Sequence, residues 1–308
     1  MVAASASYVG LPGLEAMLAL WFAALGAVVG SFLNVVVWRL PQGISLATPG
    51  SHCPRCGAPI AAHDNIPVLA WLVLRGRCRT CRGPISLRYP LVEACTAVVT
   101  VLFVRHDGLS LALPFHLVFA WALIALALID LDTWLLPFRI SLPLIPLGIL
   151  AGLAESKSAG LNAAIGAGIG WSLIVFVGFV GEMVLKKEAM GGGDSYLMAS
   201  IGAFCGPLLL WVALFLASIQ GVVYGLVRLR QRPQSVPLVP SEPVPALPEV
   251  LTPTTAPSAE SGDDDDWVPD PHAVPFGPFL ALGAIETLLW GQGLNHWVPT
   301  ISLSWLGR

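Results

Sequence analysis

Charged residues are scarce in this sequence. Asp, Glu, Lys and Arg make up 11% of its 308 residues, whereas 56% are hydrophobic and the mean hydropathy is +0.76. Soluble domains average about 25% charged residues, so this composition excludes an ordinary soluble protein. The net charge of −3 includes the four consecutive acids of residues 263–266, and without them no strong charge of either sign remains to attract nucleic acid. We therefore predict an all-α, polytopic membrane protein in contact with the lipid bilayer.

The N-terminus lacks the basic stretch that precedes the apolar part of a cleavable signal peptide. The first apolar segment is therefore predicted to stay as a membrane helix. Segment 197–227 is too long for one span and contains Cys205-Gly206-Pro207, which favours two helices. If segment 197–227 is counted as two helices, the apolar segments predict about eight transmembrane helices. The segments are residues 14–38, 89–104, 114–129, 140–154, 161–185, 197–227 and 276–290.

The basic residues predict the orientation. The loop of residues 39–88 carries seven arginines against one acid, Asp64, so the positive-inside rule places it in the cytoplasm and the N-terminus outside. With alternating spans, only Arg105, Lys157 and Arg308 of the 16 basic residues fall outside. The predicted organisation is a first helix (1–38), the cytoplasmic loop (39–88), a membrane core (89–230), a disordered Pro- and Asp-rich cytoplasmic linker (231–275), and a last helix with its tail (276–308).

Two acidic positions stand at the predicted cytoplasmic edge of the membrane. Asp194 ends the run Gly191-Gly192-Gly193, and Asp130 ends the apolar segment 121–129, with Asp132 two residues further on. An ionisable residue at a membrane edge is often functional, although helix-end charges and N-caps are the plain alternative. Residues i and i+2 point to different faces of a helix, so Asp130 and Asp132 cannot serve one site equally. The glycines allow the backbone at Asp194 to bend and to approach another chain closely.

The cysteines of the loop form two pairs at metal-ligand spacing. A C-x2-C pair is followed after 21 residues by a second one. Thiolates in this pattern form a tetrahedral, closed zinc site, which folds a loop and leaves no position for catalytic water. Gly57 and Gly83 suit the tight turns around such a metal. The predicted structural zinc ligands are Cys53, Cys56, Cys78 and Cys81.

Six stretches stand in order along the chain. They are residues 30–41 (GSFLNVVVWRLP), the four-cysteine loop, 88–93 (RYPLVE), 129–132 (IDLD) with Leu136-Pro137, 191–194 (GGGD) and 275–281 (PFGPFLA). Together they resemble the bacterial type IV prepilin peptidases, GxGD-type aspartic enzymes of the inner membrane that serve type IV pili and type II secretion. The similarity covers nearly the whole chain except the linker.

The resemblance implies cleavage of a basic leader from prepilins and pseudopilins at the cytoplasmic face, with Asp130 and Asp194 as the catalytic pair. It also implies methylation of the new N-terminus with S-adenosylmethionine, for which no stretch of this sequence independently indicates a site. We expect Asp132, Gly191 and Gly193 to support the aspartates. Glu93 has a comparable supporting place, either in binding substrate or methyl donor or in packing at the interface.

Two positions depart from the family pattern. Phe138 stands where members usually have Asp after Leu-Pro, and Tyr196 stands where they commonly have Lys after the glycine-run Asp. Three other functions remain open at this point. They are an aspartyl protease that cuts within membrane helices, a transporter that uses the aspartates as an ion or proton relay, and a catalytically divergent scaffold. The first two leave the cysteine loop unexplained.

Overall fold

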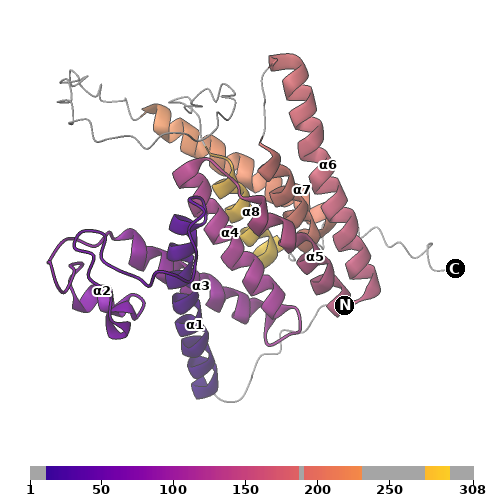
Figure 1. Ribbon diagram of the computed structural model, residues 1–308. Coiled ribbons are helices and arrows are strands. Elements are labelled where there is room, and N and C mark those ends of the chain that lie inside the picture. Colours follow the sequence, from indigo (N-terminus) through magenta and orange to yellow (C-terminus); the bar gives the residue numbers. More distant parts are fainter. Residues whose placement is uncertain (1–11, 187–190, 231–274, 292–308) are drawn as a thin grey trace, which may run out of the picture. The chain divides into compact units, whose positions relative to one another are not determined.

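The computed structural model describes residues 12–186, 191–230 and 275–291 (Figure 1). Within these ranges every regular element is a helix, apart from two isolated β-bridges, so the all-α prediction is confirmed. The predicted linker, except for Pro275, lies outside the described residues, as does the tail after Gly291. The elements are α1 (Pro12–Arg39), η1 (Ala62–Asn65), α2 (Leu69–Val73), α3 (Arg88–Asp107), α4 (Leu113–Thr133), α5 (Phe138–Glu155), α6 (Lys157–Leu185), α7 (Gly192–Arg230) and α8 (Gly277–Trp290).

Six of the described helices, α1 and α3 to α7, are long and apolar enough to cross a membrane. Helix α7 has 39 residues and is interrupted at Gly206 (φ 75°, ψ 175°), directly before Pro207, which divides it into the two segments predicted there. Helix α8 has 14 residues and spans about 21 Å at 1.5 Å per residue, less than a hydrocarbon core of about 30 Å. Outside the cysteine loop, the described residues therefore form eight helical segments.

The chain divides into two compact units, Met1–Gly221 with Pro275–Arg308, and Val222–Val274. The first unit holds every site residue discussed below. At its centre is α4, which contacts α1, α3, α5 and α8. Leu123, Leu126 and Ile129 of α4 are fully buried, because neighbouring helices surround α4 on several sides (Figure 1). Its last turn, which carries Asp130, is thereby fixed in position.

Small residues let several helices approach closely, as is usual in membrane bundles. A Cβ added at Gly30 of α1 would lie 2.7 Å from Cα of Glu93 in α3. Between α6 and α7, Gly166 and Gly202 face each other with their backbones in contact. Asn34 of α1 donates from Nδ2 to the carbonyl oxygens of Gly30 and Tyr89, both at 3.3 Å. These contacts fit the helix-packing role of small and amide residues.

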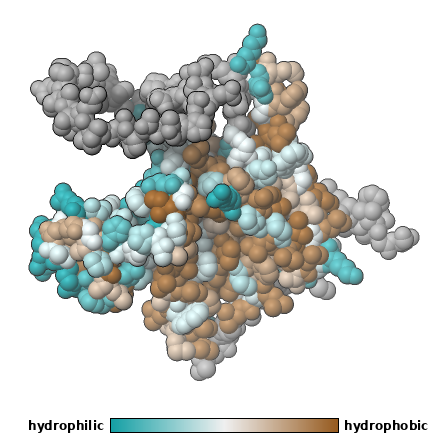
Figure 2. Space-filling view, in the orientation of Figure 1, coloured by the Kyte–Doolittle hydropathy of each residue, from teal (hydrophilic) through white to brown (hydrophobic). Residues whose placement is uncertain are grey.

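Hydrophobic side chains cover the face of the helical bundle in Figure 2, whereas hydrophilic ones gather over the lobe that contains α2. Large apolar side chains on α1 and α6 are exposed, among them Trp21 (60%) and Phe176 (65%). An apolar surface of this extent is stable only in a lipid environment or against a partner. Together with the six long apolar helices, it identifies an integral membrane protein.

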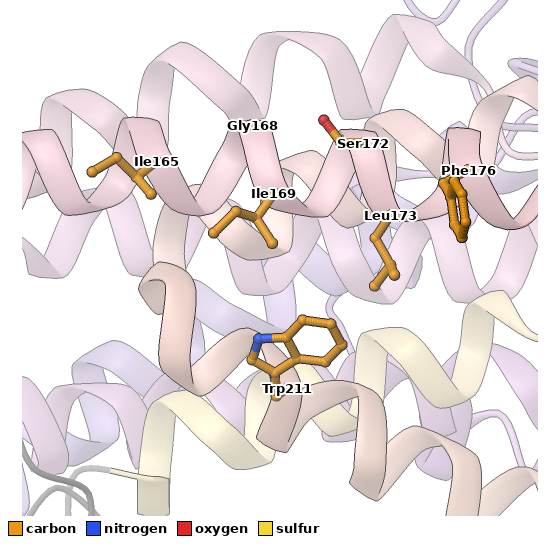
Figure 3. A pocket seen from close by; sticks show the side chains of 7 residues that line it. All are labelled: Ile165, Gly168, Ile169, Ser172, Leu173, Phe176 and Trp211. Atoms are coloured by element: carbon orange, nitrogen blue, oxygen red, sulfur yellow. The ribbon is translucent and has the colours of Figure 1, made fainter.

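A groove of about 610 Å³ runs between α6 and the second half of α7 (Figure 3). Its walls include Ile165, Ile169 and Leu173 of α6, and the ring of Trp211 faces them from α7. The hydroxyl of Ser172 and the indole N–H of Trp211 are the polar side-chain groups of the lining. No ionisable group lines this groove, so it offers no acid, base or metal ligand for a reaction.

Candidate active site and metal centre

Three segments that are far apart in sequence meet at the end of α4. Helix α4 stops after Thr133 because Trp134 takes a left-handed conformation (φ 58°), with its N–H donating to the carbonyl oxygen of Asp130 (2.9 Å). The turn of residues 134–137 then leads into α5. The start of α7 and the start of α8 both contact this turn through Leu136. Asp130 and Asp194 are thus brought to the same end of the bundle.

Asp130 lies in the last turn of α4 and is only 5% exposed. Its Oδ2 atom accepts a hydrogen bond from the backbone N–H of Gly277, the first residue of α8, at 3.0 Å. The unpaired N–H groups of a helix N-terminus favour an anionic partner. A Cβ at position 277 would lie 2.6 Å from that Oδ2 atom, so glycine is required for this close approach.

Asp194 lies in the first turn of α7 and is half-buried. Its N–H donates to the carbonyl oxygen of Gly191 at 3.1 Å. The preceding Gly193 packs so closely on Leu136 that an added Cβ would overlap the Leu136 carbonyl oxygen. Leu136 also adjoins Gly277, which holds Asp130. Because Gly193 has no side chain, it can contact Leu136 closely, and this contact places Asp194 beside the end of α4.

Asp132 has a different partner. Both of its oxygens accept hydrogen bonds from the guanidinium group of Arg88, at 2.8 and 2.7 Å. The two side chains are 37% and 43% exposed. This ion pair joins the beginning of α3 to the end of α4, and the sequence did not predict it. The only indication in the sequence was the i+2 spacing of the two aspartates, which turns Asp132 away from the side of Asp130.

Glu93 is buried in α3 and is 8% exposed. Its Oε2 atom accepts the backbone N–H of Val68 at 2.7 Å, and Val68 has a left-handed backbone (φ 61°) just before α2. Glu93 thus fastens the cysteine loop to α3. Of the two departures from the family pattern, Phe138 is 55% exposed at the start of α5, and Tyr196 is half-buried in the first turns of α7.

The four loop cysteines converge as predicted. All four Sγ atoms lie within 4.8 Å of one another. Each pair forms a knuckle closed by backbone hydrogen bonds, from Cys53 N–H to the Ala58 carbonyl (2.9 Å) and from Cys78 N–H to the Gly83 carbonyl (2.8 Å). Gly57 makes the left-handed turn of the first knuckle (φ 70°). In the second knuckle Arg82 makes it (φ 57°), so the expectation for Gly83 was wrong by one residue.

The chemistry of the sulfur cluster fits zinc. Backbone N–H groups of Cys56 and Arg55 lower the pKa of the Cys53 thiol to about 6, which favours the thiolate that binds metal. The Ala58 N–H acts in the same direction on Cys56, but desolvation and the neighbouring sulfurs raise the pKa of that thiol to about 11. A divalent cation between the sulfurs would favour the thiolate form of both Cys53 and Cys56. Four thiolate ligands suit tetrahedral zinc, with no open position for a reaction.

An ion pair supports the metal knuckles from outside. Arg79, inside the second cysteine pair, donates from Nε and Nη2 to the two oxygens of Asp64, at 2.7 and 2.6 Å. These hydrogen bonds lower the pKa of the Asp64 carboxyl. Because Asp64 belongs to η1, the pair joins the second knuckle to the segment between the two cysteine pairs.

Two family models match the chain in sequence order. Residues 24–106 match the bacterial peptidase A24 N-terminal domain, and residues 117–226 match the type IV leader peptidase family. The first range covers α3 and the cysteine loop, and the second contains Asp130 and Asp194. No solved structure was found to match the chain.

Curated relatives match over almost their full length. A protein of Myxococcus xanthus is 38% identical, over 96% of this chain and 98% of its own. Proteins of Aeromonas hydrophila and Pseudomonas aeruginosa are each 34% identical, over 94% and 88% of this chain and 96% and 90% of their own. All three are named prepilin leader peptidase/N-methyltransferase. Because relatives at 34–38% identity match 88–96% of it, the chain belongs to the type IV leader peptidase family.

Proposed function

We propose that this protein is a membrane aspartic endopeptidase that removes the leader from type IV prepilins and pseudopilins and then methylates the new N-terminus. Asp130 and Asp194 are its catalytic pair. The observation that carries the proposal is that both aspartates adjoin the turn of residues 134–137: Gly193, next to Asp194, packs on Leu136, and Gly277, whose N–H holds Asp130, lies against Leu136 as well.

Peptide hydrolysis by two carboxylates needs one ionised and one protonated group. The ionised carboxylate takes a proton from the attacking water, and the protonated one donates to the leaving amine. Two like charges held close together do not both ionise, so the pair shares one proton. The Gly277 N–H fixes the Oδ2 atom of Asp130 and leaves Oδ1 for this exchange. Positioning by the closely packed turns supplies the alignment that the reaction requires.

The active site faces the cytoplasm in this proposal, and the membrane is the bacterial inner membrane. Arg39 at the end of α1 and Arg88 at the start of α3 belong to the arginine-rich loop on the same side of the bundle as the end of α4. The positive-inside rule assigns such a loop to the cytoplasm. A substrate anchored in the bilayer by its own apolar helix would present its leader at this surface.

For the second activity, the methyl donor would be S-adenosylmethionine. When bound, it would supply an electrophilic methyl group: the bond from the neutral α-amine of the cleaved substrate to this carbon would form as the sulfonium–methyl bond breaks, with S-adenosylhomocysteine as the leaving group and the amine proton passing to water. A zinc ion held by the four cysteines would have a structural role, because a closed sulfur site offers no position for substrate. It would shape the loop that Glu93 fastens to α3.

The test is leader removal from a prepilin of the same genome by the purified, membrane-reconstituted protein, with products identified by mass spectrometry. D130N and D194N should each lose cleavage. D132N is the matched control, since it also removes one carboxylate two residues from Asp130 but leaves the pair intact. Cleavage by D194N at the wild-type rate would refute the assignment. An added mass of one methyl group on the product supports the transferase.

A further inference from the structure

A second cavity lies between one face of α1 and the loop segments before α2. Its volume is about 330 Å³. The α1 wall is formed by five residues that recur at helical spacing: Val28, Ser31, Phe32, Val35 and Arg39. A different face of α1 carries Leu33 and Val37, which form one apolar cluster with Ile129, the neighbour of Asp130. The cavity therefore uses a face of α1 other than the one that packs toward the aspartates.

A buried cation stands at one end of this wall. Arg39 is only 6% exposed. Its Nη1 and Nη2 atoms donate to the carbonyl oxygens of Ser45 (3.0 Å) and Pro49 (2.7 Å), which are neutral acceptors. Within the described residues no carboxylate forms an ion pair with Arg39, and no acid lines the cavity. A buried charge is normally paired, and a guanidinium has five N–H donors to offer. The cavity is therefore suited to one anionic group.

The same wall continues along the exposed apolar surface of α1. Val28 and Phe32 are 57% and 51% exposed, and α1 is one of the helices long and apolar enough to cross the membrane. From residue 28 to residue 39 the helix rises about 16 Å at 1.5 Å per residue. One leaflet of a hydrocarbon core of about 30 Å is about 15 Å deep. A lipid chain that lies along Val28, Phe32 and Val35 therefore has its headgroup at Arg39.

The lining also selects the kind of headgroup. An ethanolamine headgroup carries an ammonium group, which needs an acid as its partner, and the lining has none. Ser51 and Asn65 offer a hydroxyl and an amide instead, and both can hydrogen-bond the hydroxyl groups of a glycerol headgroup. The volume is at the lower end of the range of about 300–1,000 Å³ for small-molecule sites, which suits a single phosphate with its glycerol.

We propose that this cavity binds an anionic phospholipid with one phosphate, namely phosphatidylglycerol. The phosphate lies on Arg39, and one acyl chain follows the apolar wall of α1. Basic pockets at the ends of membrane helices are known to hold anionic headgroups. Because Arg39 also binds the carbonyl oxygens of Ser45 and Pro49, the lipid supports the start of the cysteine loop against α1. Lipid binding here does not depend on the reaction at the aspartates.

The experiment titrates phosphatidylglycerol into the delipidated, full-length protein in detergent and follows the bound lipid by native mass spectrometry. The wild type should bind one molecule in preference to phosphatidylethanolamine. R39Q should weaken binding about 10- to 150-fold, the range for loss of a hydrogen bond to a charged group. R77Q is the matched control, because Arg77 is an exposed loop arginine outside the lining, and it should bind like the wild type.

S51D is a second test, because it places a carboxylate in the lining and leaves the hydrogen bonds of Arg39 in place. The new carboxylate should neutralise Arg39 and repel the phosphate, so binding should be abolished. S51N is its matched control, since it has nearly the same shape without the charge, and it should bind like the wild type.

Zinc content and melting temperature show whether each variant is folded. If R39Q does not fold, the comparison of S51D with S51N decides. Folded R39Q and S51D that bind phosphatidylglycerol like the wild type would overturn the proposal. Equal binding of phosphatidylethanolamine would do the same, because it would indicate lipid that adheres without recognition of its headgroup. Displacement of the lipid by millimolar inorganic phosphate would also overturn it and would identify a free anion as the occupant.

Discussion

The hydrogen bond from Gly277 to Asp130 gives the sharpest test of the active-site geometry. In G277A the new methyl group would start 2.6 Å from Oδ2 and 3.1 Å from Cγ of Asp130, well inside van der Waals contact. Either α8 or the carboxylate must move, and the hydrogen bond is lost. A hydrogen bond to a charged group contributes about 1.5–3 kcal/mol. If this contribution is made in the transition state, leader cleavage should fall about 10- to 150-fold.

The assay is the initial rate of leader removal from one prepilin in reconstituted membranes. G168A is the matched control, because this α6 position has no atom within 4 Å of an added Cβ. It should cleave at the wild-type rate and gain up to about 1 kcal/mol of helix stability. Equal zinc content and melting temperature would show that G277A is folded. A folded G277A that cleaves within threefold of wild type would refute the role of the Gly277 N–H.

Three further predictions concern the surroundings of the pair. G193A should lose cleavage in the same assay, because its Cβ would overlap the carbonyl oxygen of Leu136; a folded variant with normal activity would refute the close packing. D132N should cleave within a few-fold of wild type and lower stability by no more than about 1 kcal/mol, since its pair with Arg88 is partly exposed; abolished cleavage would assign it a catalytic role. C56S should bind less than one zinc per chain by elemental analysis and expose the loop to protease, whereas wild-type zinc content would exclude Cys56 as a ligand.

The local patterns of the sequence predicted the helical fold and the convergence of the four cysteines. Apolar segments of spanning length predict membrane helices, because a bilayer leaves few alternatives for the backbone. The break at Gly206-Pro207 is equally local, since glycine permits the unusual backbone and proline removes a helix hydrogen bond. Two C-x2-C pairs predict their own convergence, because one ion needs all four sulfurs. The misassigned turn, at Arg82 instead of Gly83, shows that such patterns fix a motif better than the backbone of each residue.

The contacts between distant segments at the candidate active site could not be predicted from local sequence patterns. Gly277 is 147 residues from the aspartate that it holds, and no periodicity relates the start of α8 to the end of α4. Arg88 is 44 residues from Asp132 and looked like one more basic residue of a cytoplasmic loop. Such pairs depend on which helices become neighbours, and hydrophobic patterns alone do not determine this for helices that are apolar on most faces.

The turn of residues 134–137 explains why glycine is needed on two separate segments. The carbonyl oxygen of Leu136 packs against Gly193, and its side chain lies near Gly277, with an added Cβ there only 3.3 Å from Leu136 Cδ2. Leu136 therefore sets how closely both α7 and α8 approach the end of α4. A side chain at either glycine would move one helix start outward and separate a carboxylate from its partner or from its N–H donor. The geometry of the proposed catalytic pair thus depends on backbone contacts around Leu136, and the two departures at Phe138 and Tyr196 replace neither glycine nor aspartate.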